Sequence, residues 1–148
     1  MGSEKLHFTL VSGDDRHKND IIKGISRVPI KTKMNHYDDC DTFTEFLKNI
    51  EITSYHVVLI DMDDPINVGM DCLKTIRRDS SYSDIVVICY MREEDKNRVE
   101  QIFVEGGNIF FSYPQTSAKF HEVLKELVRI NWQIYTTGTS IQNLVLKL

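Results

Sequence analysis

Hydrophobic residues along this chain occur in short continuous runs, separated by segments in which they recur at helical spacing. Two runs, His56–Ile60 and Ile85–Cys89, are almost wholly aliphatic, which is typical of strands buried on both faces of a parallel sheet. Shorter or more mixed runs predict three further strands. The five predicted strands are Leu6–Val11, Val28–Lys33, His56–Ile60, Ile85–Cys89 and Asn108–Ser112.

The segments after these strands predict helices, because their apolar residues return every three or four positions. Four of them cover residues 16–27, 68–78, 94–105 and 117–131. Another begins at an N-cap at Asp41 and carries its apolar stripe on Phe43, Phe46, Leu47 and Ile50. The pair Gly106-Gly107 is a good stop for the fourth helix.

Five strands that alternate with five helices predict an α/β fold, a doubly wound five-stranded parallel sheet with helices on both faces. The flavodoxin-like strand order for such a sheet is 2-1-3-4-5. We expect one domain over residues 5–131, followed by a tail over residues 132–148. The tail contains Trp132, Tyr135 and Leu144-Val145-Leu146, so we expect it to pack on its own domain or across a dimer.

Composition narrows the class of protein. The chain has 148 residues, 41% of them hydrophobic and 27% charged, with a net charge of -4, which argues against a dedicated nucleic-acid binder. It has no apolar run long enough to span a membrane and no secretory signal peptide. Cys40, Cys72 and Cys89 are far apart, so reduced thiols and a cytoplasmic location are expected. The five histidines lack metal-ligand spacing.

The candidate chemistry lies where two of the strands end. Asp61 directly follows the third strand, with Asp63 two residues on, and Asp14 and Asp15 follow the first strand. Strands one and three are neighbours in the doubly wound order, so their carboxyl ends lie side by side. Carboxylates so close repel one another by about 1–4 kcal/mol per pair, and a hard cation such as Mg²⁺ would remove that cost.

With these residues the chain resembles the receiver domain of bacterial two-component response regulators. The resemblance rests on Val58–Gly69 (VLIDMDDPINVG) and on Gly106–Pro114 (GGNIFFSYP). It implies that Asp61 accepts a phosphoryl group from a sensor histidine kinase or a phosphotransfer protein. It also implies a Mg²⁺ site made by Asp14, Asp61 and the backbone carbonyl of Asp63, with Asp15 as a further candidate.

Such a protein would be a single-domain response regulator that signals by contact with a downstream protein target. We therefore expect it not to be an enzyme and to have neither a nucleic-acid nor a membrane partner. Whether it forms a homodimer stays open. It also implies a cis peptide bond between Tyr113 and Pro114.

The chain departs from the family at the residues that sense phosphorylation. The family's acid pair after strand one falls on Gly13 and Asp14, and its lysine falls on Tyr113. Its small hydroxyl residue at the end of strand four falls on Cys89, Tyr90 or Met91. Phe110 stands at the aromatic switch position. A degenerate pseudo-receiver, acting as a phosphorylation-independent interaction module, is therefore the alternative.

An enzyme on the same fold is the third possibility. The spacing Asp61-Met62-Asp63 suits an aspartyl-phosphate hydrolase, but the chain is too short to hold the remaining acids and lysine. A flavin binder would need a Ser/Thr-rich phosphate loop after strand one, and acidic residues stand there instead.

Overall fold

The computed structural model describes residues 5–50, 56–64, 68–138, 141 and 144–148. Its centre is a parallel sheet with the order β2-β1-β3-β4-β5-β6. The predicted order 2-1-3-4-5 is confirmed, and a short sixth strand extends it. The strands are β1 (Leu6–Val11), β2 (Thr32–Tyr37), β3 (His56–Asp61), β4 (Val86–Met91), β5 (Ile109–Ser112) and β6 (Leu146–Lys147).

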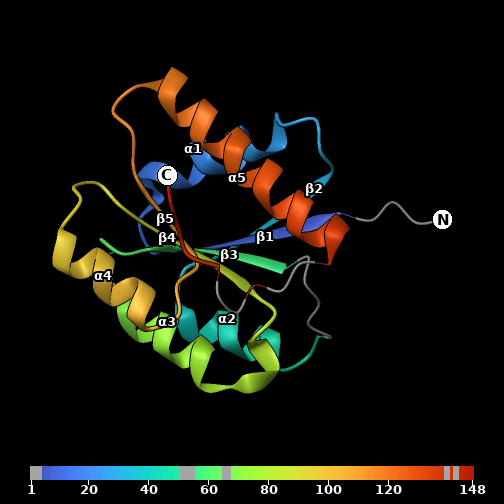
Figure 1. Ribbon diagram of the computed structural model, residues 1–148, viewed down its shortest axis with the longest axis vertical. Helices are drawn as coiled ribbons and strands as arrows, with labels where there is room; N and C mark the ends of the chain where they lie inside the picture. Colours follow the sequence, from blue (N-terminus) through green and yellow to red (C-terminus); the bar gives the residue numbers. More distant parts are fainter. Residues whose placement is uncertain (1–4, 51–55, 65–67, 139–140, 142–143) are drawn as a thin grey trace.

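Helices cover both faces of this sheet, as Figure 1 shows. Helices α1 and α5 lie together on one face, whereas α2, α3 and α4 lie on the other. Their bounds are α1 (Asp15–Ser26), α2 (Cys40–Leu47), α3 (Gly69–Arg78), α4 (Lys96–Val104) and α5 (Ser117–Thr137), and a 3₁₀ turn covers Ser80–Tyr82. Within the part of the chain that the structure describes, no helix is long and apolar enough to cross a bilayer.

The continuous apolar runs are explained by two separate cores. In β3, Val57 and Leu59 pack toward α1 and α5, while Val58 and Ile60 pack toward α2 and α3. Successive side chains of a strand point to opposite faces, so a strand covered on both sides needs apolar residues at every position.

The second strand lies four residues later than predicted. Residues 28–33 were expected to form it, but β2 is Thr32–Tyr37. Val28 instead packs into the core shared with α1 and α5, and Pro29 lacks the backbone N–H that a strand needs. Because β2 is an edge strand with half-buried residues, its polar sequence hides it from a search for apolar runs.

Helix boundaries account for two further corrections. The N-cap of α2 is Asp39 rather than Asp41, and its Oδ1 accepts a hydrogen bond of 2.7 Å from the backbone N–H of Thr42. Helix α5 was expected to end at Asn131 but continues to Thr137, where Gly138 ends it with a left-handed φ of 69°. The sequence signal for this end was the glycine itself.

The C-terminal tail packs on its own domain, one of the two arrangements that its apolar residues suggested. The backbone N–H groups of Leu146 and Leu148 donate to the carbonyls of Asn108 and Phe110, at 2.8 and 2.9 Å. The side-chain amide of Asn108 donates to the carbonyls of Ile141 and Leu144, both at 3.2 Å. The division into a domain over 5–131 and a tail over 132–148 stays a prediction, and α5 runs across it.

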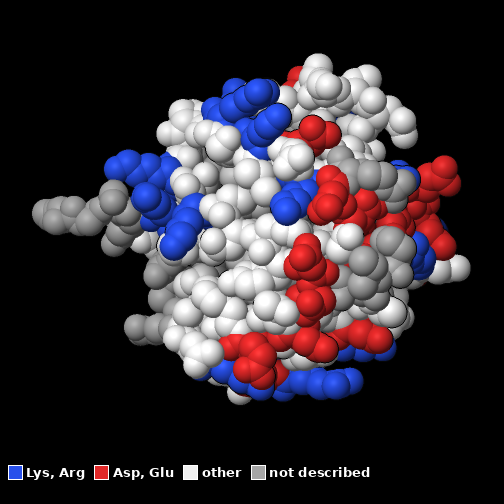
Figure 2. Space-filling model, turned by 180° about the vertical axis from the view of Figure 1, so that it is seen from behind, with Lys and Arg blue, Asp and Glu red and all other residues white. Residues whose placement is uncertain are grey.

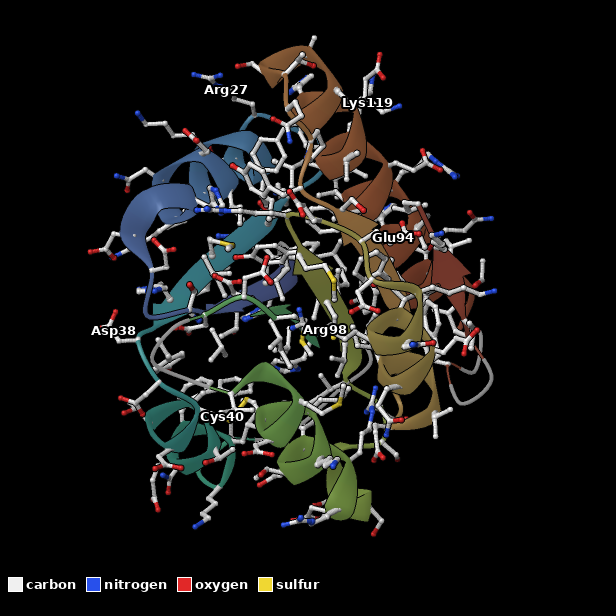
Figure 3. The ribbon with its side chains drawn as sticks, turned by 90° about the vertical axis from the view of Figure 1, so that its left-hand side faces the viewer. Arg27, Asp38, Cys40, Glu94, Arg98 and Lys119 are labelled. Carbon is white, nitrogen blue, oxygen red and sulfur yellow. A yellow bond between two sulfur atoms is a disulfide. The ribbon has the colours of Figure 1, made fainter. Side chains whose placement is uncertain are left out.

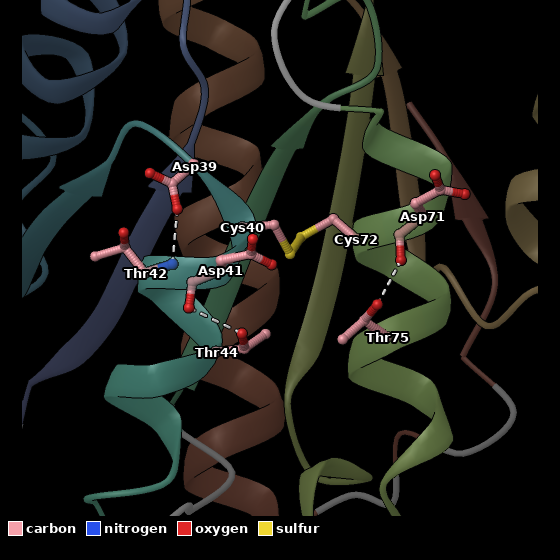
Figure 4. Close-up of a disulfide and its surroundings, with 8 residues drawn as sticks. All are labelled: Asp39, Cys40, Asp41, Thr42, Thr44, Asp71, Cys72 and Thr75. Atoms are coloured by element: carbon pink, nitrogen blue, oxygen red, sulfur yellow. Dashed lines mark hydrogen bonds between the residues drawn. A yellow bond between two sulfur atoms is a disulfide. The ribbon is translucent and has the colours of Figure 1, made fainter.

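The prediction of three reduced cysteines is wrong for two of them. Cys40 at the start of α2 and Cys72 in α3 form a disulfide with a Cα–Cα distance of 5.8 Å (Figure 4). Cys89 is a free, buried thiol, as expected. The 32-residue separation conceals the pair, because only the packing of α2 beside α3 on one face brings the two residues together.

Candidate functional site

The candidate site lies at the carboxyl edge of the sheet, where β1, β3 and β4 end together. Asp61 is the last residue of β3 and is 4% exposed. Val11 of β1 is in register with Ile60, and Asp61 is in register with Tyr90 of β4. The predicted convergence of strands one and three is therefore confirmed.

Neutral donors satisfy the Asp61 carboxylate. Its Oδ2 accepts a hydrogen bond of 3.0 Å from the hydroxyl of Ser12, and its Oδ1 accepts one of 2.9 Å from the backbone N–H of Asp63. Burial raises the pKa of Asp61, and the charges of Asp64 and Asp63 act in the same direction, while the two hydrogen bonds oppose them. Among the described residues, no lysine or arginine lies within 4 Å of this carboxylate.

Ser12 is the residue that sequence reasoning missed. The family's acid pair was expected at Gly13 and Asp14, yet the side chain that reaches Asp61 from β1 is the Ser12 hydroxyl. The same oxygen accepts a hydrogen bond of 3.1 Å from the backbone N–H of Asp14. The strand registers could have revealed it, because Ser12 directly follows Val11, whose partner Ile60 directly precedes Asp61.

Other groups of the chain hold the remaining acids of the loop after β3. The Oδ2 of Asp63 accepts a hydrogen bond of 2.7 Å from the backbone N–H of Arg92, and its Oδ1 lies 3.5 Å from Nη1 of Arg98. The Oδ2 of Asp64 accepts one of 2.7 Å from the backbone N–H of Gly13.

Two arginines supply positive charge at this acidic edge. Nη2 of Arg92 lies 4.0 Å from Oδ2 of Asp14, whose side chain is 10% exposed. Arg98 contacts Asp63 and donates through Nη2 to the backbone carbonyl of Met62 at 2.7 Å. Figure 3 looks onto this edge and shows Arg98 reaching over it from α4. In Figure 2 the same edge lies on the right, where acidic side chains gather.

The predicted Mg²⁺ ligands lie together, and the site they would form stays a prediction. Asp14, Asp61 and Asp63 all lie at this edge, Asp14 faces Arg92, and Asp15 is exposed at the start of α1. The predicted ligand from Asp63 is its backbone carbonyl, whereas Arg98 contacts its side chain. Across the described ranges, no three histidine, cysteine or acidic side chains are grouped so as to hold a metal ion. Carboxylate oxygens are the donors that Mg²⁺ prefers, and Arg92 and Arg98 compete with a cation for those of Asp14 and Asp63.

The four predicted switch positions point to different faces. Cys89 and Phe110 are fully buried in the core beneath α2, α3 and α4, away from the acidic edge. Tyr90 lies on the opposite face, where its ring stacks on Phe111 with centroids 5.3 Å apart. The Tyr90 hydroxyl is buried and has no hydrogen-bond partner among the described residues.

Tyr113, at the position of the family's lysine, is directed toward α1. Its ring stacks on His17 with centroids 3.8 Å apart and also contacts Phe120. Burial and the nearby Asp20 carboxylate raise the pKa of Tyr113 to about 12, so the phenol is neutral. The predicted cis bond to Pro114 is wrong: no cis peptide bond occurs among the described residues, which include both partners.

Among solved structures, several response regulators have a structure similar to that of this chain. The phosphorylated cyanobacterial phytochrome response regulator RcpA matches with a TM-score of 0.74 at 12% identity, covering 93% of this chain and 99% of that one. A response regulator in red light signalling of R. palustris matches with a TM-score of 0.72 at 18% identity, covering 92% and 98%. The Mn²⁺-bound form of response regulator Rcp1 matches with a TM-score of 0.70 at 13% identity, covering 82% and 90%.

No protein-family model matches the sequence. The likeness in structure nevertheless extends over nearly all of the chain and of each protein it matches. This chain therefore has the fold of the response regulator receiver domains.

Proposed function

We propose that this protein is a single-domain response regulator that takes a phosphoryl group on Asp61. The observation that carries the proposal is a buried carboxylate at the carboxyl edge of the sheet, crowded by other acids and, among the described residues, held by neutral donors alone. Burying an ion without a counter-charge is costly, and it is tolerated mainly where function requires it.

The proposed step is a displacement at phosphorus. An oxygen of Asp61 attacks the phosphorus of a phosphohistidine on a sensor histidine kinase or phosphotransfer protein. The new O–P bond forms as the N–P bond breaks, and the departing imidazole nitrogen keeps the electron pair and takes a proton from solvent. The product is an acyl phosphate, which adds about one negative charge to this edge and offers new acceptor oxygens to neighbouring donors.

A small phosphodonor tests the proposal. Wild-type protein and the variants Asp61→Asn and Asp84→Asn are incubated with acetyl phosphate, with and without Mg²⁺, and intact masses are recorded. The wild type and the control Asp84→Asn, an exposed acid in the loop before β4, should each gain one phosphate, whereas Asp61→Asn should gain none. An equal gain on Asp61→Asn would overturn the proposal. Dependence of the gain on Mg²⁺ tests the predicted metal, for which the present donor arrangement gives little support.

One set of contacts favours a second candidate, a pseudo-receiver that binds its partners without phosphorylation. Arg92 and Arg98 already balance Asp14 and Asp63, and the side chain that reaches Asp61 from the end of β1 is the hydroxyl of Ser12. This candidate expects no mass gain on any variant, together with amide resonances of Asp14, Asp61 and Asp63 that Mg²⁺ leaves unmoved.

The downstream partner is proposed to be a protein in either case.

The cytoplasmic location stays a prediction. It was argued from reduced thiols, and the disulfide between Cys40 and Cys72 removes that argument.

A further inference from the structure

We propose that the hydroxyl of Tyr90 and the guanidinium of Arg92 bind the phosphoryl group on Asp61, replacing the lysine and small hydroxyl residue that this chain lacks. This inference rests on the proposed function and names the groups that recognise the modified site.

The Tyr90 hydroxyl is a buried group that could donate a hydrogen bond to a phosphoryl oxygen. The residue is 2% exposed, and its hydroxyl has no hydrogen-bond partner in the part of the chain that the structure describes. Nearly all buried polar atoms in native proteins are hydrogen-bonded, so an orphaned hydroxyl at a candidate site calls for an explanation. An oxygen of a phosphoryl group supplies the missing acceptor.

The strand register places Tyr90 beside the site. Tyr90 is the lateral neighbour of Asp61 in the sheet, and its ring stacks on Phe111 and lies tilted to Tyr113, with ring centroids 5.3 and 6.2 Å away. Burial raises its pKa strongly, and the charges of Asp61, Asp14 and Asp64 add to the effect. The phenol therefore keeps its proton and can donate a hydrogen bond to an anion.

Arg92 is the cation best placed to accompany it. Its backbone N–H anchors the loop to Asp63, while its side chain, 43% exposed, reaches Asp14 only at the limit of an ion pair. Arg98 has less freedom, because it bonds the Met62 carbonyl and Asp63. A guanidinium can bind two phosphoryl oxygens at once, which suits Arg92 to a dianionic group.

Tyr113 is a poor substitute for the lysine even though it occupies that position. Its ring is stacked on His17, and its hydroxyl interacts with Asp20 on α1. Tyr113→Phe therefore provides a matched control, in which the same chemical change is made at a neighbouring phenol that is bonded to Asp20 and keeps its ring beside Tyr90.

The test compares beryllium trifluoride affinity, with and without Mg²⁺, and the half-life of phosphorylated Asp61. Tyr90→Phe should weaken beryllium trifluoride binding about 10-fold, since it removes one hydrogen bond to a charged group. Arg92→Gln should weaken it about 10- to 100-fold, and Arg92→Lys should restore part of the loss. Tyr113→Phe should stay within about twofold of the wild type.

Thermal unfolding separates a site role from a structural one. Without ligand, Tyr90→Phe should be at least as stable as the wild type, because the lost hydroxyl had no partner. Wild-type affinity in both Tyr90→Phe and Arg92→Gln would overturn this inference and leave phosphorylation of Asp61 intact. A wild type that binds no beryllium trifluoride and takes no phosphate would overturn both proposals.

Discussion

At the scale of single residues, Asp61 is a buried carboxyl group whose charged form is destabilised by its surroundings. Its carboxylate is buried beside Asp63 and Asp64, and desolvation raises its pKa above the ordinary value of 3.8. In the folded state the protonated form is thus favoured relative to the unfolded chain. The corresponding stability is fully present below about pH 4 and is lost as the pH rises through the raised pKa.

Replacement of Asp61 by asparagine should therefore stabilise the protein at neutral pH. Asparagine keeps an oxygen that can accept from the Asp63 N–H but carries no charge. We expect the free energy of unfolding to rise by about 1–2 kcal/mol at pH 7, which is the scale of one close like-charge contact. This difference should shrink toward zero by pH 4. Urea unfolding in EDTA between pH 4 and 8 measures the difference, and a less stable variant at pH 7 would contradict it.

Arg77 is a half-buried arginine whose hydrogen bonds give it a structural role. Its guanidinium donates to the carbonyls of Gly106, Tyr82 and Ile85, and to the Asn108 side chain at 2.7 Å. It thereby joins the end of α3 to the loops before β4 and β5.

Arg77→Met should destabilise the fold by about 3–5 kcal/mol, because it leaves several partly buried carbonyls without their donor. Arg77→Lys should recover only part of this, since an ammonium cannot span the same acceptors. Arg78→Met, an exposed change at the neighbouring position, serves as control and should cost under 1 kcal/mol. Denaturant titration of the three variants checks the order.

At the scale of elements, the disulfide joins two helices that cover the same face. It ties the first residue of α2 to α3, just beyond the loop that carries the acids after β3. Closing a loop of this length lowers the entropy of the unfolded chain, which corresponds to about 3–4 kcal/mol.

Reduction with dithiothreitol should lower the free energy of unfolding by about that amount. The double variant Cys40→Ala, Cys72→Ala should show a similar loss and no further response to the reductant, because Cys89 is free and buried. Thermal melts of both proteins, with and without reductant, test this. An unchanged melting temperature of the reduced wild type would show that the bond adds no stability.

The sixth strand is the other element whose contribution can be isolated. It covers the edge of β5, and Lys147 forms an ion pair with Glu94 before α4. Removing residues 144–148 deletes the backbone bonds from Leu146 and Leu148 and one acceptor of the Asn108 amide.

We expect this truncation to cost about 2–4 kcal/mol, from roughly three hydrogen bonds and the apolar contacts of Leu144 and Leu146. It should also raise self-association, because an uncovered β-edge pairs readily with another. Lys147→Ala is the control and should change stability by less than 1 kcal/mol, since the ion pair is exposed. Unfolding and sedimentation measurements together decide the outcome.

At the scale of the whole molecule, the doubly wound sheet explains why the central strands were predicted more accurately than the edge strands. β1, β3 and β4 were placed within a residue or two, since strands buried on both faces must be apolar throughout. β2 was misplaced because an edge strand needs no such run, and β6 was missed because two residues carry no period. Asp61, Asp14 and Asp63 were correctly brought to one edge by topology alone.

The sequence by itself determined the alternation of strands and helices, the strand order and the gathering of acids at one edge, because these follow from periodicity and chain connectivity. Only the tertiary structure decided which groups meet Asp61, that Arg92 and Arg98 balance its neighbours, and that Cys40 bonds Cys72. Such contacts join residues that are far apart in the chain. They depend on the direction of side chains and on the packing of helices, and no local sequence pattern predicts either.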